Sequence, residues 1–235
     1  MIIATVCFQQ DNAFDFVNML KVWEYTARKH NKGAKIKILR ITPPEKKERE
    51  SDALMPYNPT YAFLELAKWV LQQDEECILT DADIMFTGDC KEVFYLDFDI
   101  AGTVRPADCW LNAGVLFYKP TERGKKLLRE IITLTEIIAD APLTYSDYLK
   151  KYLGADQAAI AVIVEKEGLL QLPCEIWNSE QHSWSKFSEA TKIVHLKSSL
   201  GQLVRGEPMG SEYEKGHKIY DLYNLFQYYL KRATK

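Results

Sequence analysis

The chain has 235 residues, 47% of them hydrophobic, and a formal net charge of -3. A chain of this length and composition can bury a sizeable core, so we expect a single domain. Its acidic and basic residues are interspersed rather than clustered, which excludes the basic surface of a nucleic-acid-binding protein.

The cysteines are scattered, odd in number and without a Cys-x-x-Cys pair: Cys7, Cys77, Cys90, Cys109 and Cys174. This pattern argues against a disulfide framework and against a structural zinc site. No apolar segment approaches the ~20 residues needed to cross a bilayer, and the first residues resemble a strand rather than a signal peptide. We therefore expect a cytoplasmic protein in a reducing compartment, with no transmembrane segment.

Hydrophobic periodicity and turn residues divide the first third of the chain into alternating strands and helices. In chain order they predict a strand at 2–8, a helix at 12–31 closed by Gly33, a strand at 35–41, a charged and proline-rich loop at 42–59, a helix capped by Asn58-Pro59 and running to about Gln73, and a strand that ends at Asp81. Such alternation is typical of an α/β protein with a parallel sheet.

The remaining sequence predicts strands at 98–104 and 113–118, a helix at 121–139, a late strand ending at His195, and a final helix at 211–232. We expect one domain over 1–235, in which 1–200 form the core and 201–235 form a mobile loop and a C-terminal helix. The predicted fold is a Rossmann-like, mostly parallel central sheet flanked by helices, with a C-terminal helical extension.

Two carboxylates, one residue apart, stand at the end of the apolar run that begins at Cys77. Positions i and i+2 of an extended segment point to the same side, so Asp81 and Asp83 can face one cation while Ala82 packs behind them. Mg²⁺ and Mn²⁺ prefer oxygen ligands and often keep positions open for substrate phosphates. The pair therefore indicates a metal site for a phosphorylated ligand, although a strand ending in an ordinary turn is the alternative.

Ligands of open α/β sheets bind beyond the carboxyl ends of the strands. Residues 8–12, 81–83 and the approach to 112–114 lie at such ends. The first of these segments has no glycine, because the first glycine of the chain is Gly33. This absence excludes ordinary Rossmann dehydrogenases and P-loop kinases.

Several motifs, taken in chain order, resemble those of GT-A glycosyltransferases, and in particular the family 8 type, which includes glycogenin and bacterial lipopolysaccharide galactosyltransferases. The resemblance covers roughly residues 2–197 and rests on Thr60-Tyr61-Ala62, Ile78-Leu79-Thr80-Asp81-Ala82-Asp83, Leu111-Asn112-Ala113-Gly114-Val115-Leu116-Phe117, Asp156-Gln157, Leu172-Pro173 with Trp177-Asn178, and Val194-His195-Leu196-Lys197.

The resemblance implies a metal-dependent transfer of a sugar from a nucleotide diphosphate to an acceptor hydroxyl, with retention of anomeric configuration. Asp81, Asp83 and His195 would bind Mn²⁺ or Mg²⁺, which stabilises the leaving diphosphate. Without the resemblance, His195 alone would be more typical of a packed, hydrogen-bonded histidine. The acceptor can be a glycan, a lipid or a protein.

The resemblance also assigns the donor-binding side. Asn112, Ala113 and Gly114 would lie beside the sugar, Asp81 and Ala82 would also contact the donor, and the base would bind at Val6, Cys7, Phe8 and Gln9. The catalytic residues would be Asp156 and Gln157, although Asp156 can equally be the N-cap of a helix. UDP-sugars are favoured as donors, and GDP is not excluded.

The sequence departs from the family at the diphosphate. Family 8 members usually carry His-x-x-Gly-x-x-Lys-Pro, whereas here Lys197 follows His195 by two residues. Lys197 is the candidate for neutralising the diphosphate, and Arg205, in an expected loop, is a competing cation. Phe63 stands where some bacterial relatives have a donor-contacting arginine.

Two other functions remain alternatives. A haloacid-dehalogenase-type phosphohydrolase also uses an Asp-x-Asp after a strand, but it needs a later acidic cluster that the chain lacks. A non-catalytic nucleotide-sugar-binding protein could retain the same fold.

Overall fold

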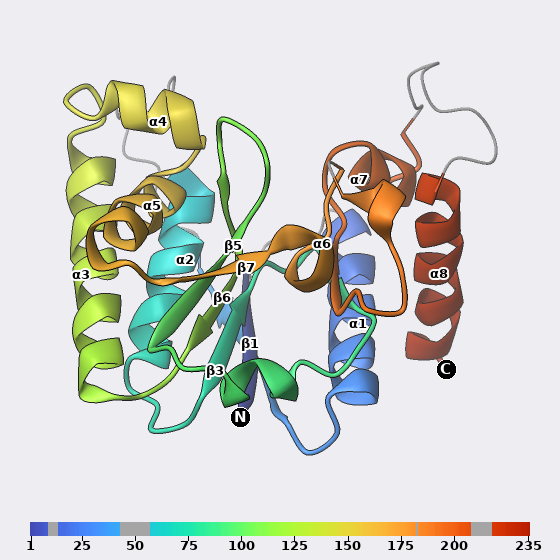
Figure 1. The fold of residues 1–235 in the computed structure, drawn as a ribbon. Helices are drawn as coiled ribbons and strands as arrows, with labels where there is room; N and C mark the ends of the chain where they lie inside the picture. Colours follow the sequence, from blue (N-terminus) through green and yellow to red (C-terminus); the bar gives the residue numbers. More distant parts are fainter. Residues whose placement is uncertain (9–13, 43–56, 182, 208–217) are drawn as a thin grey trace.

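The computed structural model describes residues 1–8, 14–42, 57–181, 183–207 and 218–235 (Figure 1). Its centre is a six-stranded sheet in the order β2-β1-β3-β6-β5-β7. The strands are β1 (Ile2–Phe8), β2 (Lys35–Ile41), β3 (Cys77–Thr80), β5 (Ile100–Val104), β6 (Leu111–Tyr118) and β7 (Leu170–Pro173). A separate two-stranded sheet pairs β4 (Ile84–Phe86) with β8 (Ile193–His195).

The predicted mostly parallel sheet is confirmed, with one reversal. β1 runs parallel to β2 and β3, and β5 runs parallel to β7, whereas β6 is antiparallel to both of its neighbours, β3 and β5. The reversal places the start of β6 beside the end of β3, since Thr80 pairs with Val115.

Helices cover both faces of the sheet. The helices are α1 (Phe14–His30), α2 (Tyr57–Val70), α3 (Glu122–Asp140), α4 (Ser146–Tyr152), α5 (Ala155–Glu167), α6 (Cys174–Trp177), α7 (Ser198–Val204) and α8 (Lys218–Ala233), with 3-10 helices η2 (Lys91–Tyr95) and η3 (Trp184–Lys186). In Figure 1, α2, α3 and α5 lie on one side of the sheet and α1 and α8 on the other.

The alternation of side chains along the strands produces these two layers. Ile2, Ala4 and Leu79 face the core formed with α2, α3 and α5. Ile3 and Ile78 face the opposite core, which includes α1. Burial on both faces explains why β1 and β3 are almost uniformly apolar.

The C-terminal helix is packed on the outer side of α1. Leu222, Phe226 and Tyr229 of α8 are buried with Met19 and Val22 of α1. The expected C-terminal helical extension is thus confirmed. Among the described residues, every helix is too short or too polar to cross a membrane.

Three local predictions need correction. Asn58 lies inside α2, which begins at Tyr57, so it is not the cap of that helix. A helix, α7, occupies 198–204, where we expected the core to lead into a loop. The strand at 98–104 is shorter than predicted, because β5 begins at Ile100.

Candidate active site

The end of β3 is fixed by buried hydrogen bonds. Trp23 Nε1 donates to Thr80 Oγ1 at 2.8 Å, and Thr5 Oγ1 donates to the Thr80 carbonyl at 2.9 Å. The Asp81 amide then donates to the Gly114 carbonyl at 3.0 Å, which continues the pairing of β3 with β6. The backbone that carries the first carboxylate is therefore held from both sides.

The small β4–β8 sheet brings His195 to the two aspartates. Ile84 pairs with His195, and the Leu196 amide donates to the Asp83 carbonyl at 2.7 Å. His195 Nε2 lies 3.2 Å from Asp83 Oδ1 and 3.5 Å from Asp81 Oδ2. The His195 side chain is 4% exposed, whereas that of Asp81 is 56% exposed, so the cluster is buried on the His195 side and open to solvent on the Asp81 side.

The three side chains fit a divalent cation. One ligand atom of each residue lies within 4.8 Å of the others. Two carboxylate oxygens and one imidazole nitrogen suit Mn²⁺ or Mg²⁺, and three protein ligands leave coordination positions for a substrate. Sequence and structure therefore agree on Asp81, Asp83 and His195 as a possible metal site.

Gly114 makes room for this cluster. A Cβ at this position would lie 2.3 Å from His195 Cε1 and 2.9 Å from Asp81 Oδ2. Both distances are shorter than van der Waals contact, so a side chain at 114 would displace the histidine or the aspartate.

The two carboxylates have opposite electrostatic environments. Desolvation by the surrounding protein, and then the negative charge on Asp83, raise the pKa of Asp81, although more than half of its side chain is exposed. Loss of water contact would also raise the pKa of Asp83, but the adjacent His195 outweighs it and the pKa is lowered.

A pocket of about 480 Å³ opens in front of the aspartates. Its walls are the end of β1, the first turns of α2, the end of β3 and the start of α5. The candidate residues that line it are Val6, Cys7, Phe8, Asp81, Ala82, Asp83, Ala113, Asp156 and Gln157, and Phe63 lines it as well. This volume suits a small-molecule ligand. Gln9 lies outside the described residues.

Asp156 is in the first turn of α5 and faces this pocket. Burial, and then the charge on Asp81, raise the pKa of Asp156 to about 6, although backbone amides and the Thr60 hydroxyl oppose the shift. The N-cap of α5 is Gly154, so the alternative that Asp156 is the N-cap is wrong.

Gln157 connects the pocket to β6. Its Oε1 accepts from the Ala113 amide at 3.0 Å, and its Nε2 donates to the Tyr152 carbonyl at 2.6 Å. Gln157 thus fixes the backbone of Ala113, a second pocket residue, while it lines the pocket itself.

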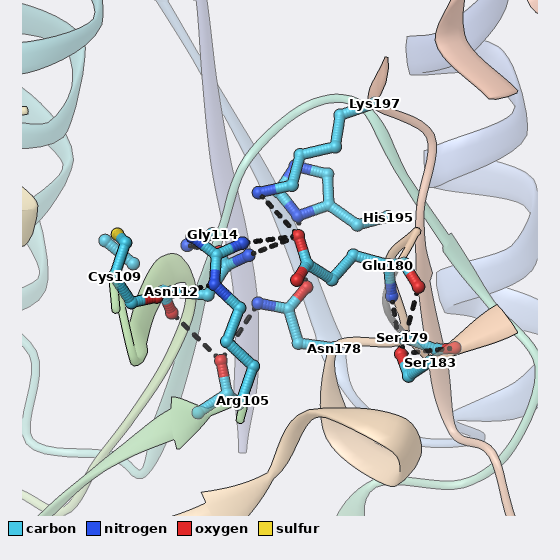
Figure 2. Close-up of polar contacts among 12 residues, drawn as sticks. Arg105, Cys109, Asn112, Gly114, Asn178, Ser179, Glu180, Ser183, His195 and Lys197 are labelled. Carbon is cyan, nitrogen blue, oxygen red and sulfur yellow. Dashed lines mark hydrogen bonds and ion pairs between the residues drawn. The ribbon is translucent and has the colours of Figure 1, made fainter. Parts of the chain in front are cut away.

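Asn112 lies behind the pocket wall and is 1% exposed. Its Oδ1 accepts from the Gly114 amide at 2.9 Å, and its Nδ2 lies 3.4 Å from Glu180 Oε2 (Figure 2). Both ends of the amide therefore have protein partners.

Glu180 is a charged centre that sequence reasoning missed. Its Oε2 lies 2.6 Å from Arg105 Nη1 and 3.3 Å from Lys197 Nζ, and its side chain is 2% exposed. Burial would raise the pKa of Glu180, but Arg105 and Lys197 outweigh it and the pKa is lowered. Lys197 was already a candidate, but Arg105 and Glu180 are far apart in the sequence and form no motif, so no sequence signal indicated them.

The two candidate cations for a diphosphate differ in their contacts. Lys197 lies beside the site, paired with Glu180, as Figure 2 shows. Arg205 ends α7 and its guanidinium bonds Glu207 at 2.7 and 3.0 Å.

Comparison with solved structures identifies the fold. A glycosyltransferase involved in glycosylation of the major capsid of PBCV-1 superposes with a TM-score of 0.58 and 12% identity, over 87% of this chain and 97% of that one. The galactosyltransferase LgtC, solved with donor and acceptor sugar analogues, gives a TM-score of 0.59 and 14% identity, over 100% and 97%. The glycosyltransferase GlyE of Streptococcus pneumoniae TIGR4 gives 0.57 and 17%, and this chain covers 62% of its length.

No protein-family model matches the sequence, and a comparison with curated proteins gives no match. The relationship is therefore visible in the fold rather than in overall sequence identity. The chain has the GT-A fold of these glycosyltransferases.

Proposed function

We propose that this protein is a metal-dependent glycosyltransferase that moves a sugar from a nucleotide diphosphate, with UDP favoured, to an acceptor hydroxyl. The observation that carries the proposal is the Asp81, Asp83 and His195 cluster at the edge of a 480 Å³ pocket, within a GT-A fold. The binding of donor and acceptor sugar analogues by the galactosyltransferase LgtC supports the same substrate class here.

Asp81, Asp83 and His195 would hold Mn²⁺ or Mg²⁺. When bound, such a cation stabilises the negative charge that develops on a leaving diphosphate. Asp81 is exposed and lines the pocket, so the phosphates would reach the cation from the pocket side.

The rest of the pocket divides into a base side and a sugar side. Val6, Cys7 and Phe8 offer apolar and backbone contacts for a base at the end of β1. Asp156 and Gln157, near Ala113, would face the sugar. With its pKa near 6, Asp156 is largely ionised at neutral pH and can stabilise positive charge on the sugar ring. We infer retention of the anomeric configuration of the sugar from the resemblance to family 8 glycosyltransferases.

Lys197 supports diphosphate binding less directly. Glu180 compensates one of the two positive charges of Arg105 and Lys197, so the group of three side chains keeps a net positive charge beside His195. This charge favours an anionic ligand at the same edge of the pocket.

A donor screen tests the proposal. UDP, GDP and their sugars are added with and without Mn²⁺, and melting temperature and donor hydrolysis are both measured. Metal-dependent stabilisation with turnover of one nucleotide sugar supports the proposal. Binding without any turnover, even with a panel of sugar acceptors, would instead favour a nucleotide-sugar-binding protein.

A further inference from the structure

Asn178 is held next to His195 by the backbone around it. The Ser179 amide donates to the Ile193 carbonyl at 2.8 Å, and the His195 amide donates to the Ser179 carbonyl at 2.8 Å. These bonds align the segment after α6 with β8, and Asn178 is completely buried. Figure 2 shows Asn178 among the residues around Glu180 and His195.

A chain of hydrogen bonds defines which way the Asn178 amide points. It starts at the backbone carbonyl oxygen of Asn112. This oxygen can only accept, so Thr103 Oγ1 donates to it at 2.9 Å. The hydroxyl has one proton, and that proton is used in this bond. Thr103 Oγ1 must therefore accept from Asn178 at 2.9 Å, which requires the amide nitrogen to face Thr103.

The amide oxygen then faces the histidine. Asn178 Oδ1 lies 3.1 Å from His195 Nδ1, and a carbonyl oxygen can only accept, so Nδ1 carries the proton. Nε2, which lies 3.2 Å from Asp83 Oδ1, can then offer its lone pair to a bound cation, and without a cation it can carry a second proton that it donates to the carboxylate. A metal-ligating histidine is usually oriented by an acceptor on its other nitrogen in this way.

We propose that Asn178, oriented by Thr103, is a positioning residue that holds His195 in the tautomer whose Nε2 lone pair faces Asp81 and Asp83. The inference rests on the metal site of the proposed function. It adds two residues outside the pocket, Asn178 and Thr103, to the set that determines metal affinity.

The tautomer can be observed in the unaltered protein. Two-bond ¹H–¹⁵N correlation spectra of the metal-free protein at alkaline pH distinguish a protonated from an unprotonated ring nitrogen, and comparison with His195→Gln assigns the signals. We expect a protonated Nδ1. An unprotonated Nδ1, with the single ring proton on Nε2, would overturn the inference without the use of any Asn178 variant.

Variants separate orientation from packing. Asn178→Ala removes the acceptor and should weaken Mn²⁺ binding about 10–100-fold, measured by the electron paramagnetic resonance signal of free Mn²⁺. Asn178→Asp keeps an acceptor for Nδ1–H and should restore Mn²⁺ affinity to near wild type, although it loses the amide donor to Thr103. Equal Mn²⁺ affinity of the wild type and Asn178→Ala contradicts the inference, and so does equal weakening in Asn178→Asp.

Thr103→Val provides a second variant of similar volume. It leaves Asn178 in place but no longer selects the orientation of its amide, so the spectra should show both tautomers of His195. A single Nδ1–H tautomer in this variant would exclude the role of Thr103.

The two proposals can fail separately. A wild-type protein that binds Mn²⁺ with the Nδ1–H tautomer, but transfers no sugar, contradicts glycosyl transfer and supports the role of Asn178. Sugar transfer with Mn²⁺ by the wild type, together with unchanged Mn²⁺ affinity in Asn178→Ala, supports glycosyl transfer and contradicts the role of Asn178.

Discussion

Gly114 and His195 approach so closely that the smallest possible side chain on the glycine would lie 2.3 Å from His195 Cε1. The contact joins two different sheets, because Gly114 belongs to β6 of the central sheet and His195 to β8 of the small one. The geometry of the metal cluster therefore depends on how these two sheets pack.

Gly114→Ala should disrupt this cluster. The added methyl group must move the His195 ring or the Asp81 carboxylate, so we expect Mn²⁺ affinity to fall at least about 10-fold. Titration with Mn²⁺ measures the loss. Gly102→Ala on β5 is the matched control, because its Cβ would meet only the ends of the Leu111 and Leu116 side chains, at 3.2 and 4.0 Å. Equal Mn²⁺ affinity in both variants would show that the close contact does not matter.

Mn²⁺ and UDP should stabilise the protein together more than the sum of their separate effects. A bound diphosphate would occupy the open metal positions, and a ligand that binds only the folded state raises the melting temperature. Asp83→Asn should lose this additional shift, measured relative to the melting temperature of the ligand-free variant. Asp97, which is exposed and does not line the pocket, provides the control substitution Asp97→Asn. An additional shift that survives Asp83→Asn, or that never occurs, would exclude a shared site.

Stability should depend on the ionisation of Asp156. Its folded-state pKa of about 6 is above the ordinary 3.8, so the folded protein binds the proton more tightly than the unfolded chain. The contribution of Asp156 is most favourable below pH 3.8 and is lost as the pH rises through about 6. Asp156→Asn should therefore be more stable than the wild type at pH 7, by up to about 3 kcal/mol.

Urea unfolding at pH 4 and pH 7 checks this expectation. The stability difference between Asp156→Asn and the wild type should be small at pH 4 and larger at pH 7. Sugar transfer should be reduced in the variant at pH 7, where the wild-type carboxylate is largely ionised. A variant that is less stable than the wild type at pH 7 would mean that the carboxylate has mainly a structural role.

Gln157→Ala should separate turnover from nucleotide binding. Gln157 would face the sugar, whereas the metal and base contacts lie elsewhere in the pocket, so turnover should fall strongly while affinity for free UDP changes little. The lost bonds to Ala113 and Tyr152 should also cost about 1 kcal/mol of stability each. Wild-type rates of transfer would assign Gln157 a purely structural function.

Glu180→Gln tests the buried charge centre. Removal of the carboxylate leaves Arg105 and Lys197 without their shared anion, and breaking a buried ion pair from one side costs about 3–5 kcal/mol. Urea unfolding measures the cost. Glu175→Gln, which removes a more exposed ion pair with Lys186, should cost less than about 1 kcal/mol. Similar costs for the two variants would show that Glu180 is not a centre of stability.

The sequence by itself determined the elements whose pattern is local. The strands Ile2–Phe8 and Lys35–Ile41 have the predicted bounds, and α3 follows Thr121, whose side chain caps it. Runs of apolar residues and capping signals act over a few positions, so they can be read without the fold. The same holds for the proximity of Asp81 and Asp83, which are separated by one residue, although the chain bends at Ala82 and Asp83 rather than staying extended.

Only the tertiary structure decided which distant residues meet. The reversed direction of β6, the pairing of β4 with β8, and the position of Asn178 beside His195 depend on contacts between segments far apart in the chain. Glu180 is a charged residue in an irregular segment, and nothing local predicts that Arg105 and Lys197 would bury it. Such a site is formed by long-range packing, because its stability comes from partners that the sequence separates by up to 75 positions.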